Sequence, residues 1–93
     1  MPWKKNVELK NKNIMWKEVL KAHYLDGYRI MVLFNDGMRK IVDFTTLLHQ
    51  YPVFKSLQDI NVFKNFKVTD TLEWENGEID IAPEYLYENG IPA

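Results

Sequence analysis

Two runs of β-branched and aromatic residues, 28–34 and 38–44, flank the polar triplet Asn35-Asp36-Gly37. Runs of this kind are typical of strands, and Gly37 supplies the positive φ that a tight hairpin needs. A three-residue loop pairs apolar residues with apolar ones and a cation with an anion, which a two-residue loop does not. We therefore predict a hairpin that sets Phe34 opposite Met38, Ile30 opposite Val42 and Arg29 opposite Asp43.

The first of these strands is apolar at every position from Ile30 to Phe34. A strand with one solvated face usually alternates apolar and polar residues, so this run predicts a central strand with both faces covered. Residues 18–25 have the pattern of a strand, and Asp26-Gly27 is a second tight-turn pair. Three consecutive strands then form an antiparallel meander.

The hydrophobic period becomes helical after residue 44, with Thr45 as an expected N-cap and Pro52 as a stop signal. Asp59 is the expected N-cap of a second short helix over residues 60–66. We expect these short helices to cover one face of the meander, because their apolar residues must be buried somewhere in so small a domain.

A second hairpin is predicted around Asn76-Gly77, the residue pair that type I′ turns favour. A two-residue loop sets Trp74 opposite Ile79 and Leu72 opposite Ile81 on one face. The other face then carries only carboxylates, those of Glu73, Glu75, Glu78 and Asp80. A helical turn or two should follow over residues 83–88, with Pro83 at its first position.

These elements predict an α+β fold: an antiparallel meander of three strands and a C-terminal hairpin, with short helices on one face. A length of 93 residues is typical of one domain. We expect residues 1–15 to form a flexible arm or an edge strand, residues 16–90 the single domain and residues 91–93 a frayed tail.

Composition excludes several classes of site and of location. The sequence contains no cysteine, which rules out disulfides, thiolate catalysis and cysteine-based metal sites. No apolar run approaches the roughly 18 residues of a membrane span, and no signal-peptide core follows the first residues. We therefore expect a cytoplasmic protein without membrane contact.

Charge is distributed unevenly, although the net charge is only −1. Six lysines stand near the beginning: Lys4, Lys5, Lys10, Lys12, Lys17 and Lys21. Seven carboxylates follow residue 69 without any Lys or Arg: Asp70, Glu73, Glu75, Glu78, Asp80, Glu84 and Glu88. A lysine-rich arm alone is weak support for nucleic-acid binding, which usually needs a basic face, so we do not expect nucleic acid as a partner.

The residues that carry most enzyme chemistry are sparse. His23 and His49 are the only histidines, and neither has a second ligand at metal-binding spacing. No nucleophile motif or phosphate-binding glycine loop is present, so no catalytic, metal or cofactor residue is predicted. The clustered carboxylates leave three interpretations open: a solvated face, a docking surface for a basic partner, or a site for a hard cation.

Trp74 is expected in the core with its N–H paired. Together with Tyr85, Tyr87, Trp3 and Trp16 it would also suit an exposed aromatic patch for a peptide or partner. The candidate partner-binding residues are Glu73, Trp74, Glu75, Glu78, Asp80 and Glu84.

One ordered series of residues extends over most of the chain: Phe34-Asn-Asp-Gly37, Asp43, Leu47-Leu48, Val53-Phe54, Leu57, Asp59, Phe63, Trp74, Ile79-Asp80-Ile81, Pro83-Glu84 and Leu86-Tyr87. This series resembles the bacterial family catalogued as domain of unknown function 2442. The resemblance implies a small α+β domain that is often encoded beside another small protein, in a manner similar to toxin and antitoxin pairs. It carries over no site residues, and Glu75 departs from it where a proline often follows the tryptophan.

Our first hypothesis is a non-enzymatic interaction domain that forms homo-oligomers or binds a small neighbouring protein as an antitoxin-like or regulatory partner. It would use sheet edges or the acidic hairpin as contact surface. The second is a metal-dependent hydrolase with Asp36, Asp80 and Glu84 in a cleft. The third is a nucleic-acid accessory factor that uses the lysine arm.

Overall fold

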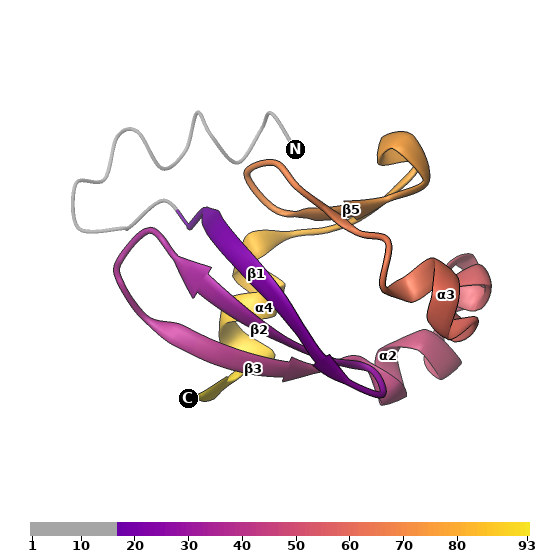
Figure 1. Ribbon diagram of the computed structural model, residues 1–93, viewed down its shortest axis with the longest axis horizontal. Coiled ribbons are helices and arrows are strands. Elements are labelled where there is room, and N and C mark those ends of the chain that lie inside the picture. Colours follow the sequence, from indigo (N-terminus) through magenta and orange to yellow (C-terminus); the bar gives the residue numbers. More distant parts are fainter. Residues whose placement is uncertain (1–16) are drawn as a thin grey trace.

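The computed structural model describes residues 17–93 (Figure 1). The predicted arm over residues 1–15 lies outside the described residues. The elements are, in chain order, β1 (Val19–Asp26), β2 (Arg29–Phe34), β3 (Arg39–Asp43), α2 (Thr45–Gln50), the 3₁₀ helix η1 (Pro52–Gln58), α3 (Ile60–Phe63), β4 (Lys67–Val68), β5 (Leu72–Trp74), the 3₁₀ turn η2 (Glu75–Gly77), β6 (Ile79–Ile81), α4 (Pro83–Asn89) and β7 (Ile91–Pro92). In this part of the chain, no helix is long and apolar enough to cross a membrane.

The strands form two antiparallel sheets, the first in the order β1-β2-β3-β7 and the second in the order β4-β5-β6. This arrangement confirms the predicted α+β class, with its meander, its second hairpin and its short helices. The predicted register of the first hairpin is also confirmed, because Ile30 pairs with Val42. Gly37 has a φ of +88°, in the left-handed region that the three-residue loop requires.

One face of β2 points into the core, where Ile30, Val32 and Phe34 are fully buried. Met31 and Leu33 point to the opposite face and are only half-buried. The prediction that both faces of this strand are covered is therefore wrong for the part of the molecule described. The run did identify the strand as an inner one of the sheet, but only its core face is fully buried.

The core lies between the first sheet, α4 and the short helices. Figure 1 shows α4 behind β1 to β3, and Leu86 from this helix is fully buried. Trp74 from β5 is 1% exposed, and its indole N–H donates to the carbonyl oxygen of Phe63 at 2.8 Å. The Phe63 ring stacks on the indole at 5.9 Å, and Phe44 meets it edge-on at 6.0 Å. The expectation that Trp74 is buried with its N–H paired is confirmed.

The helix starts differ in part from those expected. Thr45 is the first residue of α2 and not its cap; its N–H and its hydroxyl both donate to the carboxylate of Asp43, at 2.9 and 2.7 Å. Asp59 does cap α3, because its carboxylate accepts the N–H of Asn61 at 2.9 Å. The sequence predicted a helix through residue 66, whereas α3 ends at Phe63.

The residues expected to fray, 91–93, contain strand β7, which pairs with β3. The N–H of Ala93 also donates to the carbonyl of Arg39 at 3.0 Å. Gly90 makes this pairing sterically feasible, because a Cβ at that position would lie 2.8 Å from the Cβ of Lys40. The missing side chain therefore allows the end of α4 to pass close to β3 before the chain extends.

Trp74→Phe tests the role of the indole in the core. The variant leaves the Phe63 carbonyl without its donor and removes part of a fully buried ring, so we expect the free energy of unfolding to fall by about 2–3 kcal/mol. Urea denaturation monitored by circular dichroism measures this change. Val68→Ala, at an exposed position on β4, is the control and should shift the free energy by less than about 0.5 kcal/mol. An equally small effect of Trp74→Phe would contradict the assignment.

Candidate functional site

The hairpin of β5 and β6, residues 72–81, carries the predicted carboxylates and is called the acidic hairpin below. Trp74 pairs with Ile79 and Glu73 with Asp80, which confirms the predicted register. The turn has positive φ at Asn76, as a type I′ turn requires, and the N–H of residue 78 donates to the carbonyl of residue 75 at 3.1 Å. The apolar side chains of the hairpin are buried, and the carboxylates occupy its outer side.

The carboxylates of the acidic hairpin differ in their surroundings. Glu73 is half-buried and accepts the hydroxyl of Thr69 at 3.2 Å. Glu75 has a φ of 52° and accepts the hydroxyl of Ser56, in η1, at 2.7 Å. Glu78 and Asp80 are exposed. The predicted acidic face is therefore divided, because Glu75 turns toward η1 while Glu73 and Asp80 face outward on the strands.

A shallow groove of about 390 Å³ borders the acidic hairpin, between the α2–η1 segment and the β6–α4 segment. We call it the aromatic groove; its lining residues are Leu47, Tyr51, Val53, Phe54, Asp80, Ile81, Ala82 and Tyr85. Three of the lining side chains are well exposed, namely Val53 at 63%, Tyr51 at 47% and Tyr85 at 37%. Asp80 is the one charged residue that lines the groove. The groove thus joins an exposed apolar surface to the carboxylates.

The remaining candidate residues, Trp74 and Glu84, differ in their position relative to the groove. Trp74 is buried in the core, so it supports the acidic hairpin from beneath and offers no contact to a partner. Glu84 stands in the first turn of α4, one residue before Tyr85 of the aromatic groove. The structure therefore places Asp80 and Glu84 on segments that border the groove, with Glu73 and Glu78 nearby on the hairpin.

The aromatic groove was not predicted from the sequence. Tyr51 directly precedes the stop signal Pro52, and Val53 and Phe54 directly follow it, where no surface was expected. The available signal was the density of apolar residues on both sides of Pro52. Finding the groove also requires Tyr85, which lies 31 residues beyond Phe54 in the chain.

Asp36 lies away from this surface, at the tip of the first hairpin, where it joins the tip to α4. Its carboxylate accepts the backbone N–H of Met38 at 2.9 Å, the hydroxyl of Tyr87 at 2.7 Å and the ammonium of Lys17 at 3.3 Å. These bonds lower the pKa of Asp36 from 3.8 to about 2, and the bond from the backbone N–H of Met38 has the largest effect. The ammonium groups of Lys17 and Lys40 also lie 4.0 and 3.7 Å from the centre of the Tyr87 ring.

The described residues bring together no group of three or more His, Asp or Glu side chains of the kind that holds a metal ion. Asp36, Asp80 and Glu84 thus do not form the carboxylate cluster that the hydrolase hypothesis requires. His49 makes a local contact, with its Nδ1 2.7 Å from the carbonyl oxygen of Thr45, and His23 is exposed on β1.

Comparison with known proteins gives one match. A family model described as "Protein of unknown function (DUF2442)" matches residues 19–92. Neither the curated proteins nor the solved structures include a significant match to this chain. The matched segment contains the acidic hairpin, the aromatic groove and Asp36 with its partners Met38 and Tyr87, whereas Lys17 precedes it.

Asp36→Asn tests the link between the hairpin tip and α4. Because the pKa of Asp36 is lower in the folded state than its ordinary 3.8, its stabilising effect is complete above about pH 4 and is lost as the pH falls through about 2. The wild type should therefore be more stable than the variant at pH 6, and this difference should shrink below pH 4. Urea denaturation at several pH values measures it. A difference that stays constant from pH 6 to pH 2.5 would show that Asp36 is not held as described.

Proposed function

The chain belongs to the DUF2442 family of proteins of unknown function, and on this premise we propose that it is a non-enzymatic protein-interaction domain. Its binding surface is the aromatic groove together with the neighbouring carboxylates of the acidic hairpin. The ligand is a segment of a small partner protein that inserts apolar side chains into the groove and places a lysine or arginine beside Asp80.

The observation that carries this proposal is the exposure of Tyr51, Val53 and Tyr85 around a single carboxylate. Apolar side chains that gather in a hollow with a polar border are typical of interaction sites, whereas isolated exposed apolar residues are ordinary. Tyrosine is also among the residues that contribute most to binding at interfaces. The groove volume of about 390 Å³ is within the range of ligand pockets.

The charges beside the aromatic groove indicate a basic partner. Asp80 lines the groove and Glu78 is exposed at the turn of the same hairpin, so the local surface is negative. No Lys or Arg follows residue 67 in the sequence to neutralise it from within the same segment. A basic partner is attracted by this surface and orientated by it, which raises the association rate more than the final affinity.

The identity of the partner is supported by the family resemblance. The resemblance implies a gene that is often adjacent to a gene for another small protein, an arrangement similar to toxin and antitoxin pairs. The product of the neighbouring gene is therefore the partner to test first, with this chain as the antitoxin-like or regulatory member. A second copy of the chain is the alternative occupant of the groove.

Light scattering on a sizing column, with the protein alone and co-expressed with the neighbouring gene product, tests the proposal. We expect a monomer alone and a defined complex after co-expression. Val53→Asp and Asp80→Lys should each weaken the complex at least tenfold, because the first places a charge in the apolar contact and the second reverses the charge beside it. Titration calorimetry on the purified partners measures the two affinities.

Val68→Asp is the matched control, since it introduces the same charge at an exposed valine outside the groove. It should leave the affinity unchanged, and circular dichroism should show that all three variants are folded. A monomer in both preparations would overturn the proposal. A dimer of the protein alone that Val53→Asp dissociates would assign the groove to a second copy.

A further inference from the structure

The outer face of the first sheet, on the side away from α4, has a chemistry opposite to that of the acidic hairpin. The row at one end of this face, Asp26, Arg29 and Asp43, carries both charges, and Arg29 is paired with Asp26. The side chains beyond it form two further cross-strand rows that follow from the pairing of β1, β2, β3 and β7. One row is Lys21, Leu33 and Arg39, and the other is His23, Met31, Ile41 and Ile91. We call these seven residues the outer sheet face. Apolar residues thus occupy its centre, and cations stand on β1 and β3.

The apolar part of the outer sheet face is more extensive than a solvated sheet surface requires. Met31 and Leu33 stand where an alternating strand would carry polar residues. Ile91 is 70% exposed beside Ile41. A hollow of about 300 Å³ lies on this side, lined by Lys21, Ala22, His23, Met31, Leu33 and Arg39. Strand β2 therefore has the composition of a strand covered on both sides, while residues 17–93 cover only the side facing α4.

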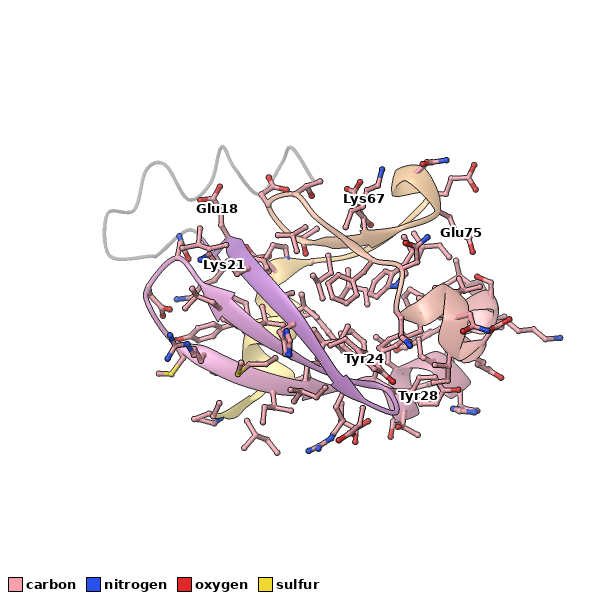
Figure 2. All side chains as sticks on the ribbon, viewed as in Figure 1. Glu18, Lys21, Tyr24, Tyr28, Lys67 and Glu75 are labelled. Carbon is pink, nitrogen blue, oxygen red and sulfur yellow. The ribbon has the colours of Figure 1, made fainter. Side chains whose placement is uncertain are left out.

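The basic side chains around this hollow are not used within the described part of the chain. Arg29 pairs with Asp26 at 2.8 Å and Lys17 with Asp36 at 3.3 Å. By contrast, the side chains of Lys21, His23 and Arg39 form no hydrogen bond or ion pair with any described residue. Figure 2 shows Lys21 on β1, well separated from Glu75 beside the turn of the acidic hairpin. This cationic surface is thus distinct from the surface of the proposed function.

We propose that the outer sheet face is a second docking surface, which binds an amphipathic helix of another protein whose apolar side is flanked by carboxylates. The spacing of the strands fits a helix. Because β2 separates β1 from β3, the outer two strands lie about 10 Å apart, close to the diameter of a helix with its side chains. A helix along β2 places its apolar side on Met31 and Leu33, with one flank near Lys21 and the other near Arg39.

Charge argues against the two other occupants. A second copy packed face to face would bring the same cations close together, which is unfavourable. Residues 1–16 contain four lysines and one glutamate, so this segment is itself basic and does not complement the outer sheet face. A partner that carries carboxylates on both sides of an apolar stripe can pair with the cations and at the same time bury the apolar centre.

A pair of synthetic peptides tests the proposal with the full-length protein. Both are 18-residue helices with leucines at i, i+3, i+4 and i+7 spacing; one has glutamates beside the leucines and the other has lysines. Titration into isotope-labelled protein, followed by amide NMR shifts, should show binding of the glutamate peptide at least tenfold tighter than that of the lysine peptide. The largest shifts should lie at Met31, Leu33 and Ile41, and added salt should weaken binding.

Charge reversal provides the specific control. The double variant Lys21→Glu with Arg39→Glu should reverse the preference between the two peptides. The matched double variant Lys55→Glu with Lys67→Glu changes the same number of exposed lysine or arginine charges outside the outer sheet face and should have no effect. Val53→Asp, in the aromatic groove, should also leave peptide binding unchanged, so this test is independent of the first proposal.

Several results would overturn the inference. These are the absence of binding by either peptide, equal binding of both, and shifts that map to the aromatic groove. A dimer of the protein alone that Leu33→Glu dissociates would assign the outer sheet face to a second copy. An increase in peptide affinity after deletion of residues 1–16 would instead assign it to that segment.

Discussion

An indole N–H in a dry interior must find an acceptor, because an unpaired buried donor costs about 1–3 kcal/mol. Trp74 solves this by donating to the backbone carbonyl of Phe63, just where α3 ends. The same side chain packs on Phe44, at the start of the first helical segment. Trp74 of the second sheet thus contacts both Phe44, the residue after β3, and Phe63, the last residue of α3. The positions of the acidic hairpin and of the aromatic groove depend on this contact.

The parts of the fold that depend on neighbouring residues in the chain were predictable. Gly37 and Asn76-Gly77 fix their turns through local backbone geometry, and the turns fix the hairpin registers that the structure confirms. The core face of β2 follows in the same way from its alternate residues. Strand β7 was not predictable, because its pairing requires α4 to pass close to Lys40, a condition set by the absence of a side chain at Gly90.

The candidate site was predictable only in part, for a related reason. Strand alternation indicates which face a carboxylate occupies, but not where the side chain reaches when the backbone φ becomes positive. Glu75 therefore bonds to Ser56 in η1 and leaves the row of carboxylates that the sequence indicated. The aromatic groove depends on the fold bringing Tyr51 and Tyr85, which are far apart in the chain, to the same surface. No local pattern contains that information, whereas the apolar run of β2 did identify the central strand of its meander.

The groove and the outer sheet face use different elements and share only the core. The groove is built from α2, η1, β6 and α4, while the outer sheet face is built from β1, β2, β3 and β7. Each surface therefore favours a partner of opposite charge, a basic one at the groove and an acidic one at the outer sheet face. Glu73 and Glu75 accept hydroxyl bonds from Thr69 and Ser56, which hold the two carboxylates in place but leave their charge. A small chain with net charge near zero can thus present two binding chemistries, because its exposed positive and negative side chains lie on different elements.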